Sequence, residues 1–157
     1  MSSQSSQSVS NTLSAISNDK SLVLFNTIAL EAGKSETLKT SLNLTRKQYY
    51  SKVSGLRDVG LIARKNGKYF LTSFGKVVYE AQMLIGKGIQ NYWKLKAIDS
   101  IGSPFSNPQL PAEEYNRFID TLIESNEIKD ILIRNDNFAA AQKAKVYKSQ
   151  ELIISAH

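Results

Sequence analysis

Hydrophobic residues recur at helical spacing along most of the chain, and the first run of them predicts a helix. This helix begins after Asn18 or Asp19, either of which can cap a helix, and stops near Gly33. Its apolar positions are Leu22, Val23, Phe25, Ile28 and Ala29. A shorter second helix is predicted from Ser35 to about Asn43, a residue that tolerates left-handed backbone.

A third predicted helix has one apolar face and one basic face. Thr45 is expected to cap it. Tyr49, Val53 and Leu56 fall four and three residues apart, so they form a stripe that we expect to be buried. The positions that point elsewhere are basic or polar, namely Arg46, Lys47, Tyr50, Ser51, Ser54 and Arg57.

Two short strands are predicted next, over residues 61–65 and 68–72. Asn66 and Gly67 join them. This pair is a strong hairpin signal, because both central residues of a type I′ turn need a positive φ. We therefore predict an antiparallel β-hairpin directly after the third helix.

A long helix is predicted from Ser73 to about residue 99, and its apolar positions step alternately by four and three residues. They are Phe74, Val78, Ala81, Ile85, Gly88, Tyr92 and Leu95. Such a seam suits a partner helix, so it predicts a homodimer in which these residues form the interface. The alternative is packing within the chain, against the first helix or the C-terminal helices.

The two ends of the chain have weaker patterns. Residues 1–17 are rich in serine and glutamine at their start and are predicted to be a disordered tail. After a break at Gly102, residues 102–157 are predicted to be a linker and a helical extension, with helices near Tyr115 and after Asn126. The predicted fold is thus mainly α with a small β-hairpin (α+β): a domain over 18–72, a long helix over 73–101 and this extension.

Positive charge is concentrated in one part of the sequence. Residues 45–76 contain eight Lys or Arg and one Asp, a net charge of +7, whereas the whole chain carries +6. Alone, a run of cations most often forms a solvated surface. Because these cations coincide with the third helix and the hairpin, they favour a surface that binds phosphates.

Several classes of function find no support in the composition. The 157 residues contain no cysteine, and the single histidine is His157, so neither a thiolate nor a histidine-based metal or catalytic site is expected. Adjacent Glu113 and Glu114 suit a helix N-terminus rather than paired acid and base catalysis. No stretch is apolar enough to span a membrane or direct export. We expect a cytoplasmic, nucleoid-associated protein that is not an enzyme and needs no cofactor.

Residues 42–62, LNLTRKQYYSKVSGLRDVGLI, resemble the turn and recognition helix of winged helix-turn-helix DNA-binding regulators. The stretch LTSFGK over 71–76 is similar to the end of a wing in that family. The pattern is typical of archaeal and bacterial repressor-like proteins with one such domain, and the resemblance covers about residues 19–99. It implies that the third helix enters the major groove of double-stranded DNA, with the hairpin on the backbone or in the minor groove.

The chemistry of the side chains gives each a predicted role. Arginine pairs with guanine and glutamine with adenine, whereas hydroxyl groups more often bind phosphates. We expect the residues near the start of the third helix to reach bases, and Lys52 and Arg57 to contact the backbone. The predicted DNA-binding residues are Thr45, Arg46, Lys47, Gln48, Tyr50, Ser51, Lys52, Ser54, Arg57, Arg64, Lys65, Asn66 and Lys68.

Two other functions compete with DNA binding. Winged helices also bind proteins in transcription machinery and other assemblies, and fold alone does not separate the two. The cluster of cations favours DNA over a protein partner. RNA binding has less support, because the sequence shows neither exposed aromatic pairs nor arginine-rich runs. No effector pocket is readable from the sequence.

Overall fold

The computed structural model describes residues 7–31, 35–102 and 110–133. These residues form eight helices and one two-stranded antiparallel sheet, so the mainly helical fold with a small hairpin is confirmed. They divide into two compact units, one up to Glu80 and the other from Ala81 onward. The division falls inside a helix rather than before it.

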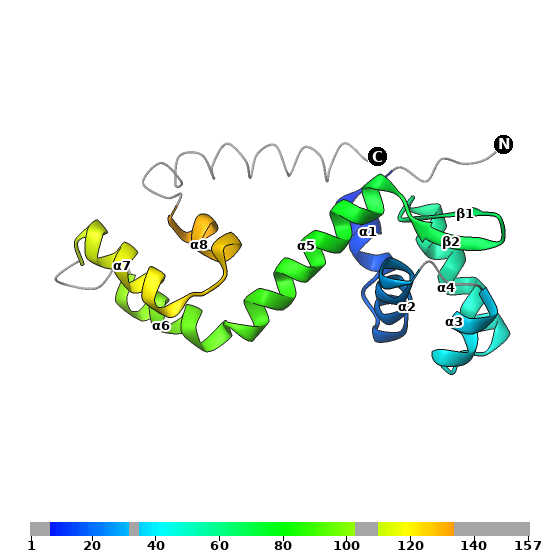
Figure 1. The fold of residues 1–157 in the computed structure, drawn as a ribbon, viewed down its shortest axis with the longest axis horizontal. Coiled ribbons are helices and arrows are strands. Elements are labelled where there is room, and N and C mark those ends of the chain that lie inside the picture. The colour runs from blue at the N-terminus through cyan, green and yellow to red at the C-terminus, as the bar shows by residue number, and fades with distance from the viewer. Residues whose placement is uncertain (1–6, 32–34, 103–109, 134–157) are drawn as a thin grey trace. The chain divides into compact units, whose positions relative to one another are not determined.

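The first unit contains most of the predicted elements. It holds α1 (Val9–Ala15), α2 (Asp19–Leu30), α3 (Ser35–Ser41), α4 (Arg46–Asp58), β1 (Ile62–Lys65), β2 (Lys68–Leu71) and the start of α5 (Ser73–Gln90) (Figure 1). Asn18 caps α2 as predicted, since its Oδ1 accepts a hydrogen bond from the Ser21 N–H at 2.9 Å. After α3, Asn43 has a φ of +48°, the left-handed backbone expected there. Gly33, the predicted helix stop, lies outside the described residues.

One hydrophobic core joins the elements of this unit. Its apolar members come from α2, α3, α4, the hairpin and the residues that join these elements, and they include Leu24, Phe25, Ile28, Leu38, Leu44, Tyr49, Val53, Leu56, Leu61, Ile62 and Tyr69. The predicted stripe of α4 is thus buried. Phe25 and Tyr79 meet edge to face, with ring centroids 6.3 Å apart, so the start of α5 also packs here.

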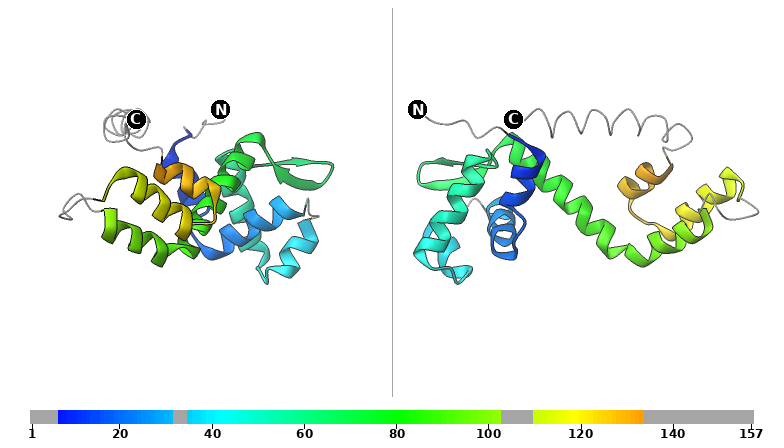
Figure 2. Two further views of the ribbon diagram at one scale, coloured as in Figure 1. Left: turned by 60° about the vertical axis from the view of Figure 1, so that its left-hand side comes forward. Right: turned by 180° about the vertical axis from the view of Figure 1, so that it is seen from behind.

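The hairpin forms at the predicted position. Ile62 pairs with Leu71 and Lys65 with Lys68, which leaves Asn66 and Gly67 as the two-residue turn. Their φ values of +52° and +74° fit a type I′ turn. Tyr69 is buried in the core. The turn end of the hairpin projects away from the helices of its unit (Figures 1 and 2).

The second unit has a separate, smaller core. It holds the rest of α5 with α6 (Tyr92–Gly102), α7 (Ala112–Leu122) and α8 (Asn126–Ile133) (Figure 2). The buried residues are Ile98, Ile119, Ile123 and Ile128, with Leu84, Leu95, Tyr115, Leu122 and Leu132 packed around them. The helices expected near Tyr115 and after Asn126 are therefore present. Residues 134–157 of the predicted extension lie outside the described residues.

The disordered tail predicted over residues 1–17 is wrong for residues 9–15, which form α1. The Ser8 hydroxyl caps this helix by accepting from the Asn11 N–H at 3.0 Å. Thr12 and Ile16, four residues apart, are buried, and α1 contacts α4. The low apolar content of this segment led to the prediction of disorder. Two buried positions are nevertheless enough to dock one short helix. Residues 1–6 lie outside the described residues.

The single long helix predicted over residues 73–101 is also wrong, because α5 and α6 are separate helices with Asn91 between them. The Lys87 carbonyl accepts from both the backbone N–H of Asn91, at 3.1 Å, and its side-chain amide, at 2.9 Å. Asparagine competes for backbone groups in this way and is a poor residue for a helix interior. The apolar seam continued past Asn91 and masked the break.

Candidate nucleic-acid interface

The helix α4 begins at a capping box that the sequence analysis did not recognise. The Gln48 N–H donates to the Thr45 hydroxyl at 3.2 Å, and the Thr45 N–H donates to Gln48 Oε1 at the same distance. Each residue satisfies a backbone N–H that the first turn of a helix leaves without a partner. Thr45 and Gln48 therefore fix the start of α4. Gln48 keeps only its amide NH₂ available for a base.

The exposed face of α4 presents cations and hydroxyl groups to solvent. Arg46, Lys47 and Arg57 are exposed, as are Tyr50, Ser51 and Ser54. Tyr50 is 51% exposed and lies against the rest of the helix through two contacts. The guanidinium of Arg46 is 5.8 Å from the centroid of the Tyr50 ring. The Tyr49 ring meets the Tyr50 ring edge-on, with centroids 5.5 Å apart. These contacts restrain an arginine and a phenol side by side near the helix start.

Two further predicted residues already make hydrogen bonds within the protein. Lys52 Nζ donates to Asn18 Oδ1 at 3.2 Å and lies 3.4 Å from Ser21 Oγ, so its ammonium ties α4 to the start of α2. Ser54 donates to Asp58 Oδ2 at 3.3 Å, one turn along α4. Lys52 thus belongs to the packing of α4 rather than to its exposed face.

The hairpin carries its cations beside the turn. Arg64, Lys65 and Lys68 are exposed, and so is Asn66. The Arg64 guanidinium lies 5.8 Å from the centroid of the Tyr69 ring. Lys65 and Lys68 are directly opposite each other across the two strands. Like charges in this arrangement repel, so an anion bound between them would be stabilising.

Anionic partners are scarce around these cations. Within the described residues the ion pairs are Lys87 with Glu127 and Lys129 with Asp120, and all four residues belong to the second unit. The acidic residue of the 45–76 segment is Asp58. The positive charge of α4 and the hairpin is therefore not neutralised by salt bridges within the described chain.

A junction at the base of the hairpin positions both elements, and sequence reasoning noticed its residues without their role. Thr72 Oγ1 donates to the Gly60 carbonyl at 2.6 Å and accepts from the Gly75 N–H at 2.9 Å. A Cβ on Gly75 would collide with the Leu61 carbonyl oxygen. Thr72 and Gly75 thus clamp the end of α4 to the start of α5. The spacing Thr-x-x-Gly was the available signal.

The residues of the predicted dimer seam do not stay together. Val78 packs against the core of the first unit, and Leu95 against that of the second. Ile85 is 59% exposed, and Tyr92 and Phe74 are also exposed. Ala81 is exposed, and Gly88 is partly so. The seam therefore supplies two cores and leaves part of its length facing solvent.

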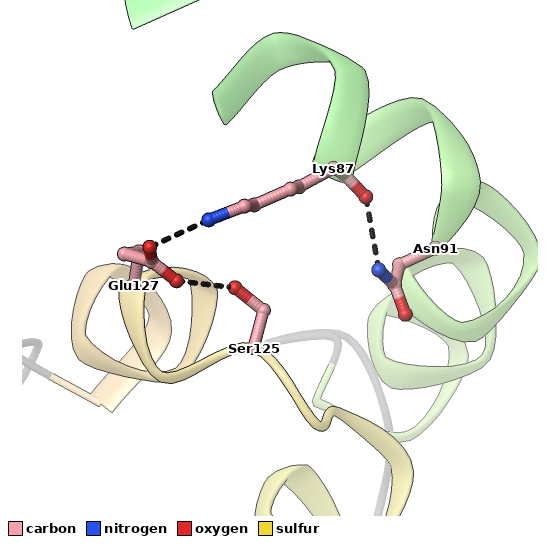
Figure 3. A network of polar contacts seen from close by, with 4 residues as sticks. All are labelled: Lys87, Asn91, Ser125 and Glu127. Carbon is pink, nitrogen blue, oxygen red and sulfur yellow. Dashed lines mark hydrogen bonds and ion pairs between the residues drawn. The ribbon is translucent and has the colours of Figure 1, made fainter. Parts of the chain in front are cut away.

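A polar network lies in the second unit, and none of its residues is among the predicted DNA-binding residues. Lys87 on α5 pairs with Glu127 on α8 at 2.6 Å, and Ser125 donates to the other carboxylate oxygen of Glu127 at 2.8 Å (Figure 3). The hydrogen bond from Lys87 is the main cause that lowers the pKa of Glu127 to about 2. This network borders an open hollow of about 520 Å³.

Two kinds of feature are absent from the described ranges. Among residues 7–31, 35–102 and 110–133, no three His, Cys, Asp or Glu side chains come close enough to hold a metal ion. None of the helices has the length and apolar character to cross a bilayer. Comparison with known proteins yielded no matching family model, no matching curated protein and no matching solved structure.

Proposed function

We propose that the chain binds double-stranded DNA and regulates transcription, with α4 as the recognition helix of a winged helix-turn-helix and the hairpin as its wing. The order of three helices, a hairpin and a further helix over α2 to α5 is the order of that fold. The observation that carries the proposal is the set of exposed cations on α4 and the hairpin without salt bridges in the described chain.

The roles of the two elements follow from their shapes. The exposed face of α4 is the part of a helix that fits the major groove, and Arg46 lies in its first turn, where side chains reach base edges. The opposed Lys65 and Lys68 suit a phosphate that relieves their repulsion. Arg46 and Lys47 therefore read sequence, and the hairpin lysines hold the backbone.

Alanine variants separate reading from holding. The probes are a duplex selected from a random library by the protein itself and a scrambled duplex, each measured by fluorescence anisotropy at four salt concentrations. Arg46→Ala or Lys47→Ala should weaken binding to the selected duplex by about 1–3 kcal/mol and affect the scrambled one less. Lys65→Ala or Lys68→Ala should weaken both alike, and the slope of log affinity against log salt should fall by about one for each phosphate that the variant no longer neutralises.

Lys94→Ala is the matched control, since Lys94 is an exposed cation of α6 in the second unit. It removes the same charge and should leave both measurements near the wild-type values. If all four variants bind both duplexes as the wild type does, α4 and the hairpin are not the DNA surface. A protein-interaction role for this fold would then replace the proposal.

A further inference from the structure

The part of α5 that lies in the second unit has two distinct faces. Leu84 packs against the core of that unit, and Lys87, three residues on, pairs with Glu127 of α8 (Figure 3). Ala81, Ile85 and Ile89 are spaced by four residues and Gly88 follows Ile85 by three, so these four residues share another face. Ile85 and Ile89 are 59% and 70% exposed. This set of four residues is called the α5 face below.

The α5 face lacks the charges that surface helices usually carry. From Ala81 to Gln90 the charged residue is Lys87, and its ammonium is held on the other side by Glu127. Gly88 costs a helix interior about 1 kcal/mol relative to alanine. A Cβ at Gly88 would meet no atom within 4 Å, so no contact in the described chain requires a glycine here. An uncharged face with small residues suits close approach by another helix.

We infer that the α5 face binds a second copy of this chain, with the two α5 helices antiparallel about a twofold axis at Ile85. An isologous contact needs a surface that complements itself. In this arrangement Ala81 lies at the level of the partner's Ile89, and Ile89 at the level of the partner's Ala81. A large side chain therefore meets a small one on each side of the axis, as packing of helix ridges into grooves requires.

The exposed apolar area also fits such a pair. At the start of α6, Tyr92 and Trp93 are also exposed, by 51% and 78%. Each aromatic side chain buries about 150–250 Å² when fully covered, so these two and the two isoleucines together offer on the order of 500 Å² per chain. A pair that covered all four side chains in both copies would bury about 1,000 Å², the low end for a specific interface. The dimer should therefore form at micromolar rather than nanomolar concentrations.

The position of Ile85 on the axis allows a charge-swap test. Sedimentation of the full chain without DNA, from about 1 to 100 μM, should show wild-type dimers. Ile85→Glu and Ile85→Lys should each weaken self-association at least tenfold, because like charges face each other across the axis. An equimolar mixture of the two variants should regain dimers. Circular dichroism spectra and melting curves of the single variants check that both remain folded.

A cross-linking test uses the absence of cysteine in the chain. Ile85→Cys places one thiol per chain at the axis and should give a disulfide-linked dimer under mild oxidation. Leu30→Cys is the control, because Leu30 is 76% exposed on α2 in the other unit. It should cross-link at least tenfold more slowly. Gly88→Leu should fold normally, since its space is open in the single chain, and should weaken self-association at least tenfold.

Three outcomes would overturn the inference. One is a wild-type mass of a single chain up to 100 μM. Another is a mixture of the two Ile85 variants that stays monomeric while the wild type dimerises. A third is equal cross-linking of Ile85→Cys and Leu30→Cys. All are measured without DNA, so they are independent of the outcome for the proposed function.

Discussion

Glu127 holds its carboxylate 2.6 Å from the Lys87 ammonium and also accepts a hydrogen bond from Ser125. These hydrogen bonds favour the charged form and lower its pKa from the usual 4.5 to about 2. The folded protein therefore binds this proton less tightly than the unfolded chain does. The resulting stabilisation is present above about pH 4.5 and is lost as the pH falls toward 2.

The titration of this one carboxyl group gives a direct prediction. Carbon-13 NMR of the side-chain carboxyl should show Glu127 titrating with a pKa of about 2 in the wild type. Lys87→Met removes the main hydrogen-bond donor, so the pKa should move up toward 4.5. Asp130→Asn, an exposed change on the same helix, serves as the control. A wild-type pKa near 4.5 would mean that the ion pair does not form in solution.

Two glycines, Gly75 and Gly55, make a matched pair for testing how closely α5 approaches the backbone at Leu61. An added Cβ at Gly75 would collide with the backbone carbonyl of Leu61, whereas one at Gly55 in α4 would meet nothing within 4 Å. Gly75→Ala should lower the free energy of unfolding by about 2 kcal/mol or more. Gly55→Ala should raise it by up to about 1 kcal/mol, because alanine favours helix. Urea titration of both variants measures the contrast, and equal effects would contradict the clamp.

At the scale of whole elements, long periodic runs and turn signals allowed the best predictions from sequence. The stripe of α4 and the Asn66-Gly67 turn lie where the pattern predicted them. Burial restricts a position to apolar residues, and a positive φ restricts it to residues such as Asn and Gly, so both can be recognised in a sequence. The break at Asn91 was missed, since an apolar seam says nothing about a side chain that competes for a backbone carbonyl. For α1 the sequence signal was weak, because Thr12, one of the two buried residues that dock this helix, is polar.

Two substitutions, three residues apart, test whether α1 packs against the core of the first unit. Ile16, just after the helix, is buried in the core of the first unit, while Leu13 within α1 is largely exposed. Ile16→Ala should lower the free energy of unfolding by about 2 kcal/mol or more, and Leu13→Ala by less than about 1 kcal/mol. Thermal and urea unfolding give both values. An Ile16→Ala protein as stable as the wild type would restore the interpretation of this segment as a tail.

At the scale of the molecule, the sequence shows where the positive charge lies along the chain. It does not show which cations make contacts within the protein and which remain available to a ligand. The +7 of residues 45–76 was visible in the composition. Which cations are engaged depends on contacts between segments far apart in the chain, such as Lys52 with Asn18 and Ser21. The division into two cores was equally hidden, because the apolar seam of residues 74–95 supplies Val78 to one and Leu95 to the other.

The clamp at Thr72 has a consequence for how this protein can change. The backbone N–H of Thr72 donates to the Leu61 carbonyl, and its hydroxyl donates to the Gly60 carbonyl, so both ends of the hairpin are fastened at one point. The two strands therefore extend from a base that is held together at Thr72. Residues can be added in pairs at the turn, or its lysines exchanged, while α4, α5 and their core keep their places. Reach and charge of the hairpin can therefore diversify independently of folding.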